Sequence, residues 1–247
     1  PMVLRIAGLA YQKGFGGHFH NDNSLAVLRD IPGLIIAVPS NGADAVKMMR
    51  ACVREAHENG RVVIFIEPIA LYMTRDLNVE GDKVWCSEYP DPDQEITVGE
   101  FGVYRSYDSK KSAAASDAAD LTILTYGNGY YYSRQATDVL AKDHGKKVKV
   151  IDLRWIAPVN IDKVVAEIGA SKRVLVVEEC RKTGSFSEYL VSALVEKMDV
   201  LPKIKVVAAD DCFIPLGQAA AAGLPKKEEI LTGALLMFGA GPEKKKK

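Results

Sequence analysis

Short apolar runs separated by helix-like stretches fill the second half of the chain. The runs have the length and composition of buried strands, and apolar residues recur at helical spacing between them. The expected strands are Leu121–Tyr126, Val148–Asp152, Arg173–Glu178 and Ile204–Ala208, and the expected helices are Tyr131–Lys142, Ile161–Ile168, Ser187–Lys197 and Lys226–Met237. This alternation predicts an α/β domain, doubly wound around a mostly parallel sheet.

The first part of the chain repeats the alternation on a smaller scale. Val3–Ile6, Leu34–Val38 and Val62–Glu67 are apolar runs of strand length. A helix is expected between the second and third runs, beginning near Ser40–Asp44, where polar side chains can cap it, and ending at Asn59-Gly60. The order strand, helix, strand predicts a parallel crossover unit.

The middle of the chain has a weaker pattern. Ile96–Tyr104 is expected to form a strand at a sheet edge, and residues 106–119 are small and polar, which is typical of a linker. We therefore divide the chain into a first α/β unit with its connecting segment (1–105), a linker (106–119), a second α/β domain (120–241) and a lysine-rich disordered tail (242–247).

The composition narrows the functional classes. Lys plus Arg and Asp plus Glu number 32 each, which argues against a general nucleic-acid or anionic-membrane binder, because such proteins need a basic surplus. No apolar run approaches the ~20 residues that span a bilayer. The four cysteines are far apart, which favours reduced thiols in an intracellular compartment. The start at Pro1 reads as a buried strand, so we expect a fragment or a processed product.

The loop from Gly14 to Asn23 holds the best candidates for chemistry. It contains three glycines, His18 and His20, followed by Asn21-Asp22-Asn23. The glycines could simply form a turn, or they could let the backbone approach a ligand while a histidine moves protons. A metal site at His18 and His20 is a weak alternative, because a third ligand is not evident.

Two other motifs have structural as well as functional interpretations. Gly127-Asn128-Gly129 follows a strand, in the position of the first turn of a nucleotide-binding fold. The third glycine of G-x-G-x-x-G is missing, however, which favours a simple tight turn. Glu178-Glu179 ends a strand where ligands often bind, although an ion pair with Arg154 or Arg181 is the simpler interpretation. His57 and His144 are expected at helix C-termini, where a positive charge is favoured.

Several motifs, in this order, resemble one enzyme family. They are Pro1-Met2-Val3-Leu4-Arg5, Gly16-Gly17-His18-Phe19-His20, Ile31-Pro32-Gly33-Leu34, Val38-Pro39-Ser40 with Asp44-Ala45, Phe65-Ile66-Glu67-Pro68 with Leu71-Tyr72, Ile151-Asp152-Leu153-Arg154 with Pro158, and Val177-Glu178-Glu179 with Gly184. Together they resemble the beta subunit, or beta half, of thiamine diphosphate-dependent 2-oxo acid dehydrogenase decarboxylating components, in the transketolase-like superfamily.

The resemblance implies an activity and a division of labour. Residues 1–105 would be the C-terminal part of a pyrimidine-binding domain, and residues 120–241 a transketolase-type C-terminal domain. The reaction would be oxidative decarboxylation of a 2-oxo acid, of the pyruvate or branched-chain type, with acyl transfer to lipoamide. His20 falls on the family's active-site histidine, whereas Asn21-Asp22-Asn23-Ser24 departs from the family pattern and leaves the 2-oxo acid open.

The resemblance also implies what the chain would need from elsewhere. Thiamine diphosphate and magnesium would bind in the complete enzyme, with no cofactor-binding or metal-ligating residue in this chain, which would be inactive alone. The implied partners are an alpha subunit or alpha-like half, a second copy through the C-terminal domain, and the lipoyl acyltransferase component, with no nucleic acid and no membrane. The expected location is the cytoplasm, or the mitochondrial matrix in a eukaryote.

Two alternatives remain at this point. One is a fragment of a transketolase or deoxyxylulose-phosphate synthase, although the loop offers Asn and Asp where basic contacts to a phosphosugar would be expected. The other is a non-catalytic subunit that serves assembly only.

Overall fold

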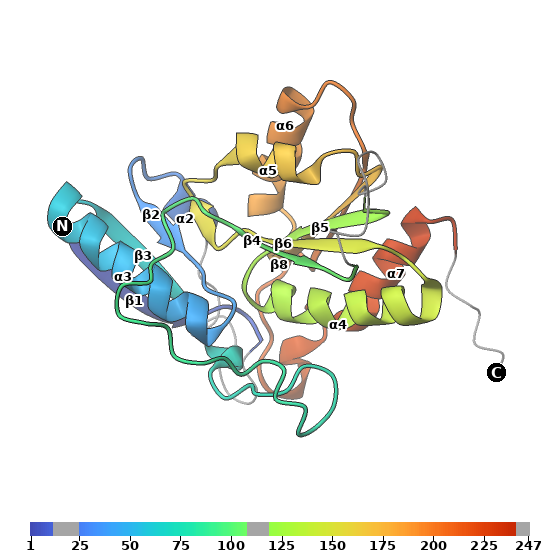
Figure 1. Ribbon diagram of the computed structural model, residues 1–247, viewed down its shortest axis with the longest axis horizontal. Helices are drawn as coiled ribbons and strands as arrows, with labels where there is room; N and C mark the ends of the chain where they lie inside the picture. Colours follow the sequence, from blue (N-terminus) through green and yellow to red (C-terminus); the bar gives the residue numbers. More distant parts are fainter. Residues whose placement is uncertain (12–24, 108–118, 241–247) are drawn as a thin grey trace.

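The computed structural model describes residues 1–11, 25–107 and 119–240, which form two neighbouring sheets with helices packed around them (Figure 1). The elements before residue 107 are β1 (Met2–Gly8), α2 (Leu25–Arg29), β2 (Ile35–Ala37), α3 (Gly42–Asn59), β3 (Val62–Pro68), the 3-10 turn Ile69–Leu71 and β4 (Gly102–Arg105). Residues 108–118, which are most of the predicted linker, and the predicted tail 242–247 lie outside the described residues.

The second half supplies the larger number of elements. They are β5 (Leu121–Thr125), α4 (Gly127–His144), β6 (Val148–Asp152), β7 (Trp155–Ala157), α5 (Ile161–Ile168), β8 (Arg173–Arg181), α6 (Phe186–Lys197), β9 (Lys203–Ala209), the 3-10 turn Gly217–Ala221 and α7 (Lys227–Met237). The predicted alternation of strands and helices is confirmed, and so is the α/β fold class. Among the described residues, no helix has the length and apolar character to cross a bilayer.

Each sheet contains a strand from the other half of the chain. Sheet A has the order β1-β3-β2-β7, in which β1, β3 and β2 are parallel and β7 is antiparallel to β2. Sheet B has the order β4-β6-β5-β8-β9, in which only β4 is antiparallel to its neighbour. In each sheet, a strand from before the predicted linker therefore pairs with a strand from after it.

The prediction of a strand over Ile96–Tyr104 is wrong for most of its length. Only Gly102–Arg105 is a strand, and it lies at the edge of sheet B, where Gly102 pairs with Asp152 and Arg105 with Lys149. Ile96 is buried instead against the α3 side of sheet A. The segment therefore leaves one sheet and joins the other, and a single continuous strand could not do both.

The caps of α3 follow directly from its sequence. Asn41 caps the N-terminus by accepting a hydrogen bond from the backbone N–H of Asp44 at 2.9 Å, and Asp44 lies in the first turn. Gly60 ends the helix in the left-handed conformation, which glycine adopts without a steric penalty. Asn41 therefore fixes the start of α3 at the carboxyl ends of the strands of sheet A, and Gly60 fixes the end of the helix.

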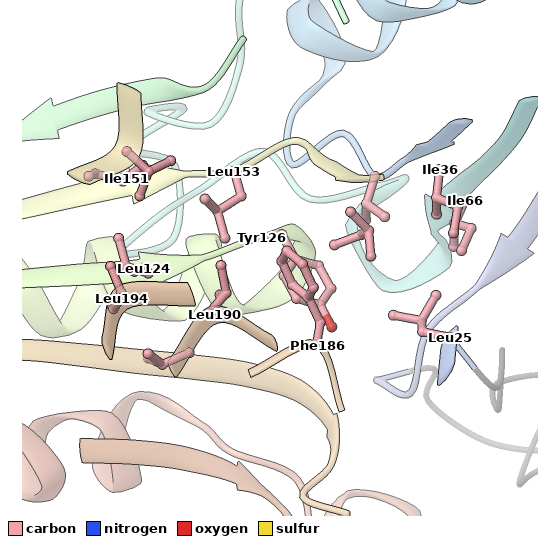
Figure 2. Close-up of a cluster of buried hydrophobic side chains, with 14 of the residues drawn as sticks. Leu25, Ile36, Ile66, Leu124, Tyr126, Ile151, Leu153, Phe186, Leu190 and Leu194 are labelled. Carbon is pink, nitrogen blue, oxygen red and sulfur yellow. The ribbon is translucent and has the colours of Figure 1, made fainter. Parts of the chain in front are cut away.

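One apolar core joins the two halves. It includes Leu25, Ile36 and Ile66 from the first half and Tyr126 and Phe186 from the second, all at most 3% exposed. Figure 2 shows these side chains between the two sheets, with Leu190 and Leu194 of α6 to the left of Tyr126 and Phe186. The opposite face of sheet A packs against α3 through a second cluster, which includes Phe65, Met48 and Trp155.

Candidate functional site

The carboxyl edge of sheet A is where the candidate site lies. The parallel strands β1, β3 and β2 all end there, and in parallel α/β sheets ligands bind outside this edge. The loop that carries His18 and His20 follows β1, but both histidines lie outside the described residues. The described part of the candidate site consists of the two flanks of that loop and the cleft at the edge.

Both flanks of the loop are fastened to the second half of the chain. On one side Tyr11 is buried, donates a hydrogen bond from its hydroxyl to the carbonyl of Pro225 at 2.7 Å, and packs 5.3 Å from the ring of Tyr132. On the other side Leu25 is buried in the shared core, and the guanidinium of Arg29 lies 5.2 Å from the ring centre of Phe186. The second half of the chain thus holds both flanks of the loop that carries His20.

A cleft of about 780 Å³ opens at the same edge. Its apolar lining includes Met49, Phe65 and Trp85, and its polar lining includes Asn41 at the N-terminus of α3. An apolar cavity with a few converging polar groups is the usual form of a small-molecule site.

A charged network spans the mouth of this cleft. Arg5 donates to Glu67 through its Nε at 2.6 Å and a terminal nitrogen at 3.2 Å, and the Tyr72 hydroxyl donates to the same carboxylate at 2.5 Å. Burial alone would raise the pKa of Glu67, but the hydrogen bonds from Arg5 and Tyr72 outweigh it, so this pKa is lowered. Burial and the contact with Glu67 raise the pKa of Tyr72 to about 12, so Glu67 is ionised and Tyr72 is protonated at neutral pH.

From the sequence, Glu67 and Tyr72 were only parts of a motif and Arg5 had no predicted role. One signal could have revealed the network. Arg5 is the single charge in the apolar run of β1, and Glu67 is the single charge in the apolar run of β3. Two lone opposite charges on predicted neighbouring strands indicate an ion pair.

The N-terminus of α3, on the wall of the cleft, is joined to the second half by buried polar contacts. The Ser40 hydroxyl donates to Asp152 at 2.9 Å, and Arg154 donates to Asp44 at 2.9 and 2.8 Å. Burial raises the pKa of Asp152 to about 7, with nearby Arg154 opposing that rise. The wall of the cleft is therefore positioned by residues that lie more than 100 positions further along the chain.

The buried pair Glu178-Glu179 has hydrogen-bond partners that the sequence did not predict. Glu178 accepts hydrogen bonds from the Tyr126 hydroxyl and from the backbone N–H of Ser187, the latter at 2.9 Å. Glu179 accepts from both the backbone and the side chain of Asn128. Of the two predicted ion-pair partners, Arg154 pairs with Asp44 instead, whereas the alternative with Arg181 stays a prediction.

Gly127-Asn128-Gly129 forms the first turn of α4, and its anion-binding position is filled from within the protein. The Glu179 carboxylate accepts the Asn128 N–H at 3.1 Å, where a nucleotide-binding fold would hold a phosphate. A Cβ at Gly127 would collide with the free Oε2 of Glu179, and one at Gly129 would collide with the Thr125 hydroxyl. The tight-turn interpretation accounts for both glycines.

No group of three or more histidine, cysteine or acidic side chains in the described part of the chain could hold a metal ion. His57 and His144 lie in the last turns of α3 and α4, as predicted. The weak alternative of a metal site at His18 and His20 falls within residues 12–24, outside the described residues.

The comparisons with known proteins decide the family of the second half. Residues 111–229 match the model of the transketolase C-terminal domain. This part of the chain is a transketolase C-terminal domain.

Most of the chain has distant relatives among pyruvate dehydrogenase subunits. A pyruvate dehydrogenase E1 component subunit beta from Staphylococcus aureus is 28% identical over 237 residues, covering 93% of this chain and 65% of the relative. The Staphylococcus epidermidis subunit of the same name is 28% identical over 227 residues, covering 89% and 62%. The chain is thus a distant homologue of these subunits over most of its length and spans about two thirds of theirs, so the resemblance drawn from the motifs is confirmed at this level.

A solved structure described as a split gene transketolase, an inactive beta4 tetramer, has the same fold. The TM-score is 0.65, and the match covers 96% of this chain and 66% of that chain. At 18% identity the likeness concerns the fold alone.

Proposed function

We propose that the chain is part of the decarboxylating component of a 2-oxo acid dehydrogenase of the pyruvate or branched-chain type. The activity of the whole enzyme would be oxidative decarboxylation, with acyl transfer to lipoamide. The observation that carries the proposal is that the loop with His20 follows the carboxyl end of β1, next to the Glu67 end of β3 and its cleft, in a chain 28% identical to E1 beta subunits.

In this proposal His20 donates or accepts a proton during acyl transfer. An imidazole has an ordinary pKa of about 6.5, so both of its forms are available near neutral pH. The Arg5–Glu67–Tyr72 network would fix the shape and charge of the cleft beside it, and the C-terminal domain would hold the loop through Tyr11 and Leu25.

Thiamine diphosphate would supply an electron sink for the decarboxylation in the complete enzyme. The described residues do not fit the cofactor by themselves. They include no metal-holding group for the magnesium diphosphate, and Glu67, the carboxylate of the cleft, is already bound by Arg5 and Tyr72. We therefore assign no step through the cofactor to this chain.

The proposed partners follow from the similarity to E1 beta subunits. They are an alpha subunit or alpha-like half that completes the cofactor site, a second copy bound through the C-terminal domain, and the lipoyl acyltransferase component. We propose that the complex works in the cytoplasm, or in the mitochondrial matrix of a eukaryote. The neighbour of similar fold is itself described as a tetramer.

The test is His20→Ala in the assembled enzyme. We expect acyl transfer to lipoamide to fall by at least about 100-fold, the usual contribution of a general acid–base group, while thiamine diphosphate binding changes little. His57→Ala, at the far end of α3, is the matched control. Equal losses of binding and transfer, or no loss, would refute the role of His20.

The same assembled enzyme separates the alternatives. Turnover of pyruvate or a branched-chain 2-oxo acid supports the proposal. Turnover of phosphosugars instead would favour a transketolase-like enzyme, and the absence of all thiamine-dependent turnover would favour an assembly subunit.

A further inference from the structure

The hydrogen bond between Tyr11 and Pro225 closes a small cavity beside the buried Glu179 carboxyl. Its length is 2.7 Å, and the residues that precede its two partners, Ala10 and Leu224, both line the cavity and are 6% and 7% exposed. The cavity has a volume of about 30 Å³, and Glu179, which is 1% exposed, lines it too. The bond therefore joins two parts of the cavity wall, one that follows β1 and one that follows β9.

The part of the wall that follows β9 has a backbone hydrogen bond of its own. The N–H of Asp210 donates to the carbonyl of Gly223 at 3.0 Å, and both residues line the cavity. A Cβ at Gly223 would lie 2.8 Å from a carboxylate oxygen of Asp210, so the two segments touch closely at this point. The Asp210 amide can therefore report whether the wall is closed.

Only one oxygen of the Glu179 carboxyl is hydrogen-bonded within the described residues. Oε1 accepts from the backbone N–H of Asn128 at 3.1 Å and from the side chain of the same residue, whereas Oε2 is buried without a partner. A neutral carboxyl can carry its proton on Oε2, but an ionised oxygen in a buried site needs water or a cation.

The groups around this carboxyl favour its neutral form. Burial raises the pKa of Glu179 to about 8, hydrogen bonds from Asn128 oppose the rise, and the charges of Glu178 and Asp152 add to it. The other titratable groups that line the cavity or interact with the carboxyl are Tyr11 after β1, Tyr126 and Tyr132 in or next to α4, Cys180 and Arg181 of β8, and Asp210 and Cys212 after β9. Arg181 is the only cation in this set.

We propose that Glu179 controls a pH-sensitive clamp between the two halves of the chain. While the carboxyl is protonated, the Tyr11–Pro225 bond holds the cavity closed. When the proton leaves to solvent, residues 210–225 move away from Tyr11 and admit water to the carboxylate. The driving force is the cost of a buried charge, which hydration relieves.

The clamp is independent of the proposed chemistry. It concerns Tyr11, the last described residue before the loop that carries His20, so it sets the pH range in which that flank is fastened to the second half. The competing response to ionisation is an ion pair of Glu179 with Arg181, which would leave the cavity closed.

The sign of the pH dependence follows from the two states. The closed state keeps the proton until about pH 8, whereas the hydrated open state loses it near the ordinary pKa of 4.5. The open state therefore binds fewer protons between these values, and the equilibrium constant for opening rises about tenfold per pH unit until it levels off above pH 8.

Hydrogen exchange of the Asp210 amide measures this constant. After correction for the intrinsic rate of an unstructured amide, exchange should accelerate about tenfold per unit between pH 5 and pH 8 in the unmodified chain. Glu179→Gln keeps the shape of the neutral carboxyl and should abolish this slope. Tyr11→Phe should keep the slope and raise exchange at least about fivefold at every pH, because the Pro225 carbonyl loses its donor. Glu188→Gln, at an exposed position of α6, is the control and should match the unmodified chain.

Dilute urea separates local opening from global unfolding. It should leave the exchange of the Asp210 amide unchanged while it accelerates that of Ile123, which is fully buried in the middle of sheet B. Equal slopes for Glu179→Gln and the unmodified chain would overturn the clamp and favour the ion pair with Arg181. Equal sensitivity of the two amides to urea would also overturn it, because no separate opening would then exist.

Discussion

Arg154 shows how far a single side chain can act from its place in the sequence. It follows β6 with a positive φ of 60°, and its side chain reaches Asp44 in the first turn of α3. Local sequence suggested Glu178-Glu179 as its partner, because those carboxylates lie at a neighbouring strand end. The true partner is 110 positions away, and its choice depends on tertiary packing that no local pattern records.

The buried carboxyls give a prediction about pH. Burial raises the pKa of Glu179 from its ordinary 4.5 to about 8, although hydrogen bonds from Asn128 oppose the rise. In the unfolded chain the group loses its proton near its ordinary pKa, whereas the folded chain keeps it until about pH 8. The folded state therefore binds more protons between these values, and the free energy of unfolding falls as pH rises through them.

Glu179→Gln should remove this part of the pH dependence. We expect the thermal midpoint of the variant to decline less between pH 5 and pH 8 than that of the unmodified chain, measured by circular dichroism. Asp152, whose pKa burial raises to about 7, and Glu178, whose pKa burial also raises, contribute to the remaining decline. Glu188→Gln, at an exposed position of α6, is the control and should follow the unmodified profile. Parallel profiles for Glu179→Gln and the unmodified chain would contradict the assignment.

At the scale of elements, α4 offers a comparison between its two ends. Gly127 and Gly145 both have positive φ, at 55° and 60°. A Cβ at Gly145 meets nothing within 4 Å, whereas one at Gly127 collides with Glu179. Gly145→Ala should therefore cost about 1 kcal/mol of backbone strain. Gly127→Ala should cost roughly 2–4 kcal/mol, because overpacking adds to the strain.

Urea unfolding of the two variants measures the difference. The strain at the two ends is similar, so the excess cost at Gly127 reports the collision with Glu179 alone. Equal costs would mean that the Glu179 side chain moves aside without penalty.

Elements with a clear apolar period were predictable, and the short ones were not. Val148–Asp152 and Ile161–Ile168 were predicted with the bounds of β6 and α5. The three-residue β7 went unpredicted because its pairing with β2 depends on the other half of the chain. Helix α2, with five residues, owes its position to the burial of Leu25 in the shared core. Such elements are too short for a periodic signal.

The candidate site, like the fold, was predictable only where it depends on local sequence signals. The sequence predicted a site in the loop with His20, which stays a prediction, and it indicated the neighbourhood of Glu67, because glycines, histidines and strand ends are local signals. It missed the cleft mouth formed by Arg5, Glu67 and Tyr72, and the support of the site by Tyr11 and Arg154. Those depend on contacts between distant segments.

At the scale of the whole molecule, we expect the chain on its own not to bind thiamine diphosphate. The described residues supply no magnesium-holding group, and Arg5 and Tyr72 already occupy Glu67. Titration calorimetry with thiamine diphosphate and magnesium should give no saturable heat, whereas the enzyme assembled with an alpha subunit should give a clear isotherm. Saturable micromolar binding by the chain alone would show that it contains a complete site.

The exchange of strands between the sheets has a consequence for synthesis. During translation, sheet A lacks its fourth strand until the ribosome has reached Ala157, and β4 waits for β6 before it has any neighbour. The first half therefore cannot finish folding while it emerges, in contrast to chains whose domains mature one after another from the N-terminus. Its apolar surfaces would remain available to chaperones until β7 has left the exit tunnel.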